Sequence, residues 1–86
     1  MTAKLFESIV AAVRSVSQRT QTMAITPNSL FVEDLALDSL DLVGVLMKLE
    51  DDYDTKIELD DVPNIRTVAD LAEHLDKLVG GRSAAA

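Results

Sequence analysis

The residues best suited to chemistry gather around Ser39, where the sequence predicts the start of a helix. Asp38 is a good N-cap for a helix from Ser39 to about Asp54, and Asp41 adds negative charge to its first turn. The start of a helix presents unpaired N–H groups and the positive end of the helix dipole, which favour an attached phosphate. Serine is also common at helix starts for capping alone. Position therefore leaves two interpretations open, a modification site and a structural serine.

The same predicted helix has two apolar faces. At about 100° per residue, one face is an ordinary core stripe, which consists of Leu42, Val45, Leu46, Leu49 and Tyr53. The second group lies on the Ser39 side of the helix and consists of Leu40, Val43 and Met47, with the acidic residues Asp41, Glu50 and Asp51 around it. Either the helix is buried on two sides, or this group is an exposed docking patch with an acidic rim.

The net charge of −7 is concentrated in the middle third of the chain. Residues 33–61 hold eleven acidic side chains against Lys48 and Lys56, a net charge of −9, and the remainder of the chain sums to +2. An acidic surface repels phosphates, so the sequence argues against nucleic acid as a partner. Protein partners with basic patches are favoured, because complementary fields raise the rate of encounter.

Other chemistries fail on the residues that they require. A hydrolase that pairs Ser39 with His74 would lack the G-x-S-x-G motif and the glycines of a nucleophile elbow. A calcium loop that starts at Asp52 would place Ile57 at the position of the required glycine. The absence of cysteine excludes disulfides, zinc–thiolate sites and thiol nucleophiles. We therefore expect neither an enzyme nor a metal site.

The periodicity predicts an all-α fold, a small four-helix bundle of three main helices and one short helix, with a long loop between the first two. The first helix is predicted over residues 3–19, the loop over 20–37 and a short helical turn over 60–65. A capping box at Thr67-Val68-Ala69-Asp70 opens the last helix, which Gly80 is expected to end. This gives one domain over residues 1–80 and a flexible tail over 81–86.

Length and hydropathy complete this picture. A chain of 86 residues forms one domain, and no apolar run approaches the roughly 20 residues of a membrane-spanning helix. The N-terminus shows no signal peptide. We expect a free-standing, monomeric, cytoplasmic protein.

The segment Leu35-Ala36-Leu37-Asp38-Ser39-Leu40-Asp41 resembles the attachment motif of acyl carrier proteins, in which Asp-Ser-Leu opens the second helix. The run from Leu42 to Ile57, the long loop before the serine, and the Thr-Val start of the last helix extend the resemblance over roughly residues 3–79. The resemblance implies a covalent cofactor, 4'-phosphopantetheine from coenzyme A, on Ser39, with Asp38 assisting the attachment. It also implies that Leu40, Val43 and Met47, together with Asp41, Glu50 and Asp51, form the docking face.

The partners implied are a phosphopantetheinyl transferase and the acyltransferases, ketosynthases or acyl-activating ligases of fatty-acid, polyketide or related lipid biosynthesis. Two positions depart from the family pattern: Ala36 stands where the family commonly has glycine, and Gly44 where it often has an acid. We expect Ala36 to change the loop turn and Gly44 to flatten the surface beside the apolar patch. An adaptor domain whose Ser39 is never modified, and a peptidyl or aryl carrier, are the alternatives.

Overall fold

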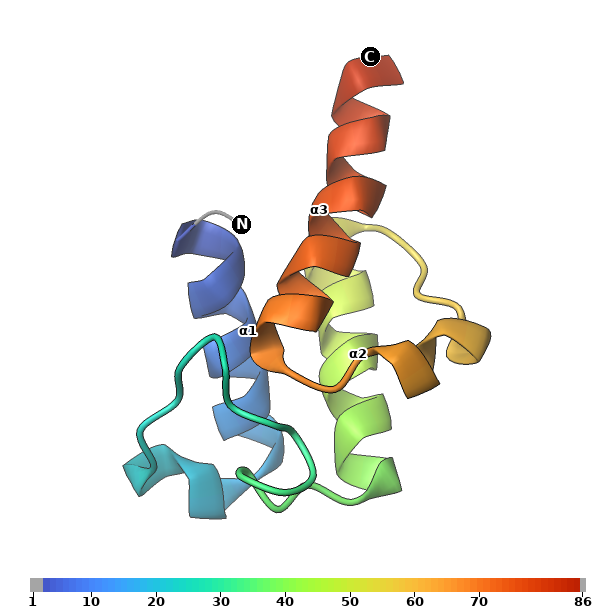
Figure 1. The fold of residues 1–86 in the computed structure, drawn as a ribbon. Coiled ribbons are helices and arrows are strands. Elements are labelled where there is room, and N and C mark those ends of the chain that lie inside the picture. The colour runs from blue at the N-terminus through green and yellow to red at the C-terminus, as the bar shows by residue number, and fades with distance from the viewer. Residues whose placement is uncertain (1–2, 86) are drawn as a thin grey trace.

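The computed structural model describes the backbone of residues 3–85, and their side chains except those of Leu59 and 80–85. Three α-helices form the body of the fold: α1 (Ala3–Val16), α2 (Ser39–Tyr53) and α3 (Val68–Ala85). Two short 3-10 helices, η1 (Gln18–Thr22) and η2 (Leu59–Asn64), lie in the connections. Figure 1 shows α1 and α2 antiparallel, with α3 crossing in front of them and its C-terminal end extending beyond the other two helices. The predicted all-α architecture is confirmed.

The core is aliphatic and lies where the three helices meet the long loop. Its buried side chains come from the three α-helices and from the connections before and after α2; they are Leu5, Ile9, Ala12, Val13, Phe31, Leu35, Leu37, Leu42, Val45, Leu46, Leu49, Ile57, Ile65, Val68, Leu71, Ala72 and Leu75. Full burial of a valine, leucine or isoleucine side chain contributes roughly 1.5–3 kcal/mol to the free energy of unfolding. Among the described residues, no helix is both long and apolar enough to cross a membrane.

The first helix is shorter than predicted. It ends at Val16 instead of residue 19, and η1 follows after Ser17, whose backbone is extended. The side chain of Thr20 is buried, and its hydroxyl donates a 2.6 Å hydrogen bond to the carbonyl of Ser17. Side-chain hydroxyls that bond nearby carbonyls compete with the helical pattern, so the chain turns away here.

The long loop is pinned across the bundle. The N–H of Phe31 donates to the carbonyl of Arg66 at 3.0 Å, and the N–H of Val68 donates to the carbonyl of Ser29 at 3.1 Å. The loop also buries the side chains of Phe31 and Leu35, which are 1% exposed. The path of the chain toward α2 is therefore fixed by both hydrogen bonds and burial.

The last helix begins as predicted and ends later. Thr67 and Asp70 form a capping box, in which Oγ1 of Thr67 accepts from the N–H of Asp70 at 3.0 Å and Oδ2 of Asp70 accepts from the N–H of Thr67 at 3.1 Å. Gly80 does not stop the helix, which continues to Ala85. Glycine ends a helix by adopting left-handed dihedrals, and Gly80 is helical instead. The division into a domain over 1–80 and a flexible tail over 81–86 stays a prediction.

Ala36 adopts a backbone conformation that glycine adopts more easily. Its φ is 55°, in the left-handed region, and its side chain is exposed. The residue differs from the family pattern, and its φ is one that glycine adopts more easily; the expectation of a different turn stays a prediction. A non-glycine residue in this region costs roughly 1–2 kcal/mol.

We predict that Ala36→Gly raises the free energy of unfolding by about 0.5–1 kcal/mol, because relief of this strain outweighs the added freedom of the unfolded chain. Urea unfolding measures the change. Ala24→Gly is the matched control, since Ala24 is also an exposed loop alanine but has no positive φ. That substitution is expected to lower stability slightly, and a loss of stability in both variants would contradict the prediction.

A second prediction concerns pH. Hydrogen bonds from the N–H groups of Thr67 and Arg66 hold the pKa of the Asp70 carboxyl below its usual value of 3.8. Because the folded pKa is lowered, the unfolded chain binds more protons in this range, and the contribution of Asp70 is present above about pH 5 and lost as the pH falls below 3.8. The stability difference between the parent and Asp70→Asn is therefore expected to be largest near neutral pH and to shrink in acid. Asp76→Asn, which removes an exposed carboxylate from the same helix, is the control.

Candidate functional site

Ser39 is the first residue of α2, and Asp38 is its N-cap. Oδ1 of Asp38 accepts from the N–H of Asp41 at 2.8 Å, and Oδ2 of Asp41 accepts from the N–H of Asp38 at 3.4 Å. This reciprocal pair is a capping box. The predicted roles of Asp38 as the cap and Asp41 as a first-turn acid are confirmed, and the pair fixes the backbone on both sides of Ser39.

The hydroxyl of Ser39 is exposed, and among the described residues it forms no hydrogen bond. The N-cap that a serine could have provided is provided by Asp38. The structure therefore removes the interpretation of Ser39 as a capping residue. The N–H groups of the first helical turn lie next to this hydroxyl, and a phosphate bound to it would meet the positive end of the helix dipole. The position fits a phosphate-linked group.

Beside Ser39 lies an exposed apolar patch. Leu40 is 82% exposed, Met47 61% and Val43 37%, so the second apolar group of α2 is not buried in the bundle. Val32, in the loop before α2, is 60% exposed. The sequence analysis did not select Val32, because periodicity gives no signal in an irregular segment. We call Leu40, Val43 and Met47 the docking patch, after the role that we propose for them below.

The acidic residues near the docking patch have different environments. Oε2 of Glu50 accepts from the N–H of Ile57 at 2.7 Å, and the Glu50 side chain is half-buried. Asp51 and Asp52 are exposed. Glu50 therefore holds the chain that leaves α2, a structural role that helical periodicity did not indicate because its partner lies seven residues away.

Gly44 lies where α2 approaches the end of α1. A Cβ placed on Gly44 would meet the two γ-methyl groups of Val16 at 3.4 and 3.5 Å. The missing side chain of Gly44 therefore lets α2 approach the end of α1 closely. The expected flattening of the surface next to the docking patch stays a prediction.

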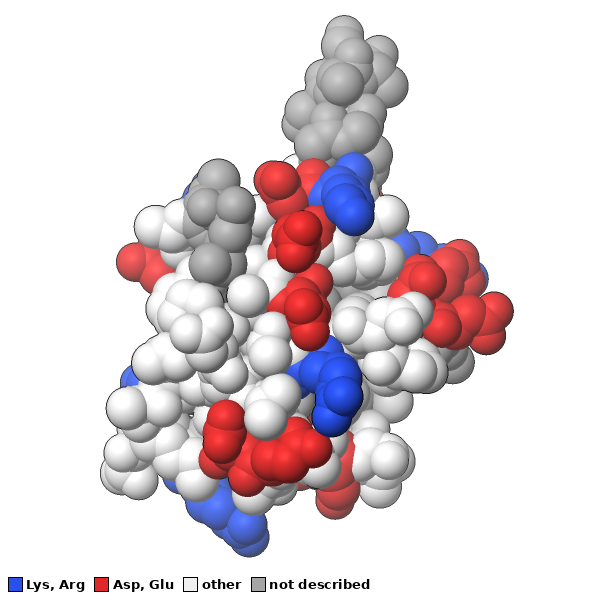
Figure 2. Space-filling view, in the orientation of Figure 1, with Lys and Arg blue, Asp and Glu red and all other residues white. Residues whose placement is uncertain are grey.

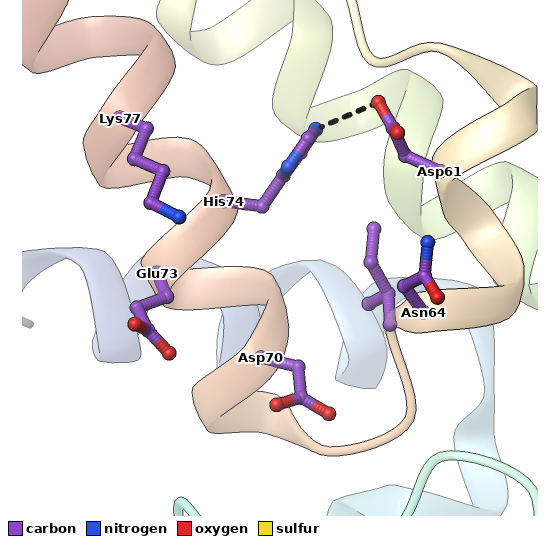
Figure 3. Close-up of a pocket in the computed structure, with 7 residues that line it drawn as sticks. Asp61, Asn64, Asp70, Glu73, His74 and Lys77 are labelled. Atoms are coloured by element: carbon purple, nitrogen blue, oxygen red, sulfur yellow. Dashed lines mark ion pairs between the residues drawn. The ribbon is translucent and has the colours of Figure 1, made fainter.

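Within the part of the chain that the structure describes, His74 is paired with Asp61 and not with Ser39. Its Nε2 lies 3.6 Å from Oδ2 of Asp61, and the two side chains join α3 to η2 (Figure 3). They line a polar pocket of about 230 Å³, together with Asn64, Ile65, Asp70, Glu73 and Lys77. In Figure 3 the side chains of Asp70 and Glu73 point away from His74. Among the described residues, no group of acidic and histidine side chains is arranged to hold a metal ion.

An apolar recess lies near the first turns of α2. It has a volume of about 230 Å³ and is lined by residues of the loop, α2 and the η2 region, namely Phe31, Val32, Glu33, Leu42, Val62, Pro63, Ile65 and Arg66. Leu42 follows Ser39 by three residues, which is about one helical turn. The recess and the exposed hydroxyl therefore lie at the same end of α2.

The face formed by α3 has mixed charge. Figure 2 shows a row of acidic side chains along α3 with basic side chains at both ends of the row, and a second acidic group over the segment that contains η2. At the start of α3, Arg66 lies 3.9 Å from Glu33 in an exposed ion pair. Exposed pairs of this kind contribute about 0–1 kcal/mol.

Comparison with known proteins shows the family of this chain. Residues 7–75 match the family model of the phosphopantetheine attachment site. The chain belongs to the acyl carrier protein family. Its members are carriers and not enzymes, and phosphopantetheine is the cofactor that the matched domain attaches.

Several acyl carrier proteins are similar to this chain. The acyl carrier protein of Brachyspira hyodysenteriae is 38% identical over 71 residues, which cover 83% of this chain and 87% of the relative. The meromycolate extension acyl carrier protein of Mycobacterium tuberculosis is 35% identical over 75 residues, and the match covers 84% of this chain but 65% of that relative. A solved structure of a candidate acyl carrier protein from Mycobacterium tuberculosis superposes with a TM-score of 0.73 at 34% identity, over 83% of this chain and 93% of that one.

We predict that the two neighbouring acids of α2 differ in their effect on stability. Glu50→Ala is expected to lower the free energy of unfolding by about 1–2 kcal/mol, because the N–H of Ile57 loses a charged acceptor. Asp51→Ala, the matched control, removes an exposed carboxylate and is expected to change stability by less than about 0.5 kcal/mol. Chemical denaturation measures both. Equal effects would show that Glu50 has no special structural role.

Proposed function

We propose that this protein holds acyl groups as thioesters on a 4'-phosphopantetheine arm attached to Oγ of Ser39, and presents them to biosynthetic enzymes. The observation that supports this most directly is the exposed hydroxyl of Ser39, which has no hydrogen bond among the described residues although it directly follows the N-cap Asp38. The family match, which spans this position, supplies the identity of the attached group.

The attachment is a transfer from coenzyme A. Oγ of Ser39 forms a new bond to the phosphorus that bears the pantetheine, a P–O bond of the coenzyme A pyrophosphate breaks, and adenosine 3',5'-bisphosphate leaves. The serine proton passes to a base of the transferase. Asp38 assists by its position, because its capping hydrogen bond to the N–H of Asp41 holds the serine at a fixed place on the surface.

The attached arm supplies a terminal thiol for acyl groups, and the protein's own residues do the rest. The N–H groups at the start of α2 stabilise the phosphate of the arm. The apolar recess beside Leu42 offers a place for part of an apolar cargo. The docking patch gives partner enzymes a common apolar contact, and short-lived binding lets one carrier visit several enzymes.

The charge distribution favours enzymes with basic docking surfaces. Asp41 and Asp51, on the N-terminal and C-terminal turns of α2, place negative charge on both sides of the docking patch. Transferases, ketosynthases, acyltransferases and acyl-activating ligases are the proposed partners. Because relatives at 35% identity are named for meromycolate extension, an acyl group of the fatty-acid type is the cargo that we favour over a polyketide. A monomeric state and a cytoplasmic location stay predictions.

We predict that incubation with coenzyme A, magnesium and a broad-range phosphopantetheinyl transferase adds one phosphopantetheinyl group to the parent protein and none to Ser39→Ala. Intact-protein mass spectrometry measures the addition. Ser15→Ala is the matched control, since Ser15 is another exposed serine, located on α1, and this variant should gain the group as the parent does.

The same experiment separates the alternatives. If Ser39→Ala gains the phosphopantetheinyl group, the attachment residue is not Ser39. No modification of the folded parent, while a known carrier reacts in the same tube, would favour an adaptor domain whose serine is never modified.

A further inference from the structure

The exposed side of α2 is not uniformly acidic. Acids lie at its two ends, with Asp38 and Asp41 at the start and Asp51 and Asp52 near the finish. Between them, the turn from Gly44 to Lys48 has no acidic side chain at all. The docking face therefore has two negative ends and a centre of different character.

The centre contains a notch. Gly44 has no side chain, and a Cβ placed on it would meet the two γ-methyl groups of Val16 at 3.4 and 3.5 Å. We call this position, where a side chain is missing beside Val16, the notch. Leu40 and Met47 lie four residues before and three residues after Gly44, which makes them its neighbours on the helix surface. Both project into solvent, at 82% and 61% exposed. Two exposed apolar side chains thus flank a position where a side chain is missing.

A cation borders this notch. Lys48 lies one helical turn after Gly44 and is exposed. Asp51 and Asp52, three and four residues further on, are at the spacing of helical ion pairs. Among the described residues, however, Lys48 forms no ion pair. Its ammonium group is therefore available to a carboxylate on another molecule.

We propose that Gly44 and Lys48 determine which partners dock on this carrier. The surface fits a protein partner that inserts one apolar side chain over Gly44, places a carboxylate beside Lys48, and presents basic side chains to the acidic ends of α2. The assignment rests on complementarity between the two surfaces. The acidic ends of α2 meet basic side chains of the partner, Lys48 meets a carboxylate, and the notch meets an apolar side chain. The proposal rests on the proposed carrier function and names the chemistry of its partners.

The same arrangement acts against other partners. A surface with an unbroken basic strip would bring a positive charge next to Lys48, and like charges in contact reduce affinity. A flat surface would leave the notch at Gly44 unfilled and lose packing contacts. Partner choice therefore depends on two residues that contribute little to the net charge.

The test uses the full-length apo protein and two synthetic amphipathic helical peptides. Both peptides have lysines at their ends; the first has a central leucine next to glutamates, and the second has lysines in place of those glutamates. NMR titration of the 15N-labelled protein measures both affinities. We expect the first peptide to bind roughly three- to tenfold more tightly and to shift the amide signals of Gly44 and Lys48.

Variants test each residue. Lys48→Glu is expected to reverse the preference between the two peptides, whereas Lys4→Glu, which changes an exposed lysine on α1, is expected to keep it. Gly44→Ala partly fills the notch while its Cβ stays at an ordinary contact distance from Val16, and it should weaken binding of the leucine peptide about two- to fivefold. Circular dichroism confirms that each variant is folded.

Equal affinity of the parent for both peptides would overturn the proposal, as would a preference that survives Lys48→Glu. Failure of the carrier function gives a different result: Ser39 would remain unmodified while the peptide preference was intact. Conversely, a modified Ser39 without any peptide preference would leave the carrier function standing and refute only the role of Gly44 and Lys48.

Discussion

The position of Ser39 depends on one constraint, the attachment of the long loop to the start of α3. The N–H of Phe31 and the carbonyl of Ser29 are bonded to the backbone around Thr67, and the side chain of Phe31 is buried in the core. A loop of this length without such contacts would adopt many conformations, because ordering it costs conformational entropy. The start of α2 would then have no fixed position relative to α3. Once the loop is fixed, Asp38 reaches the place where it caps α2, and Ser39 follows on the surface.

The second helix has to satisfy two environments at once. One face packs into an aliphatic core, and its burial holds α2 in the bundle. The other face leaves Leu40 and Met47 in water, which brings no gain in folding free energy. Exposed apolar side chains next to an exposed serine are useful only when another molecule covers them. The bundle therefore supplies the stability that the docking face does not.

The sequence-based predictions missed some features because periodicity and residue type do not show which contacts a side chain makes in the fold. The side chain of Thr20, buried and bonded to Ser17, ends α1 earlier than its apolar periodicity indicated. Gly80 carries the usual signal for a helix end, yet α3 continues past it, since glycine permits helical dihedrals as well as left-handed ones. Glu50, expected only as a rim acid, accepts a hydrogen bond from Ile57. Each of these outcomes depends on geometry that the residue type alone does not specify.

The sequence by itself determined the three main helices, apart from their exact ends, and the candidate attachment residue. The Asp38 cap and the capping box before α3 act through hydrogen bonds between residues three apart, and amphipathic spacing repeats every three to four residues. All of these signals can therefore be recognised in the linear chain. Only the tertiary structure decided that the docking patch is exposed, that Gly44 lies against Val16, and that Val32 projects into solvent. Those properties arise from contacts between segments far apart in the sequence, and they depend on how the helices pack, which periodicity does not encode.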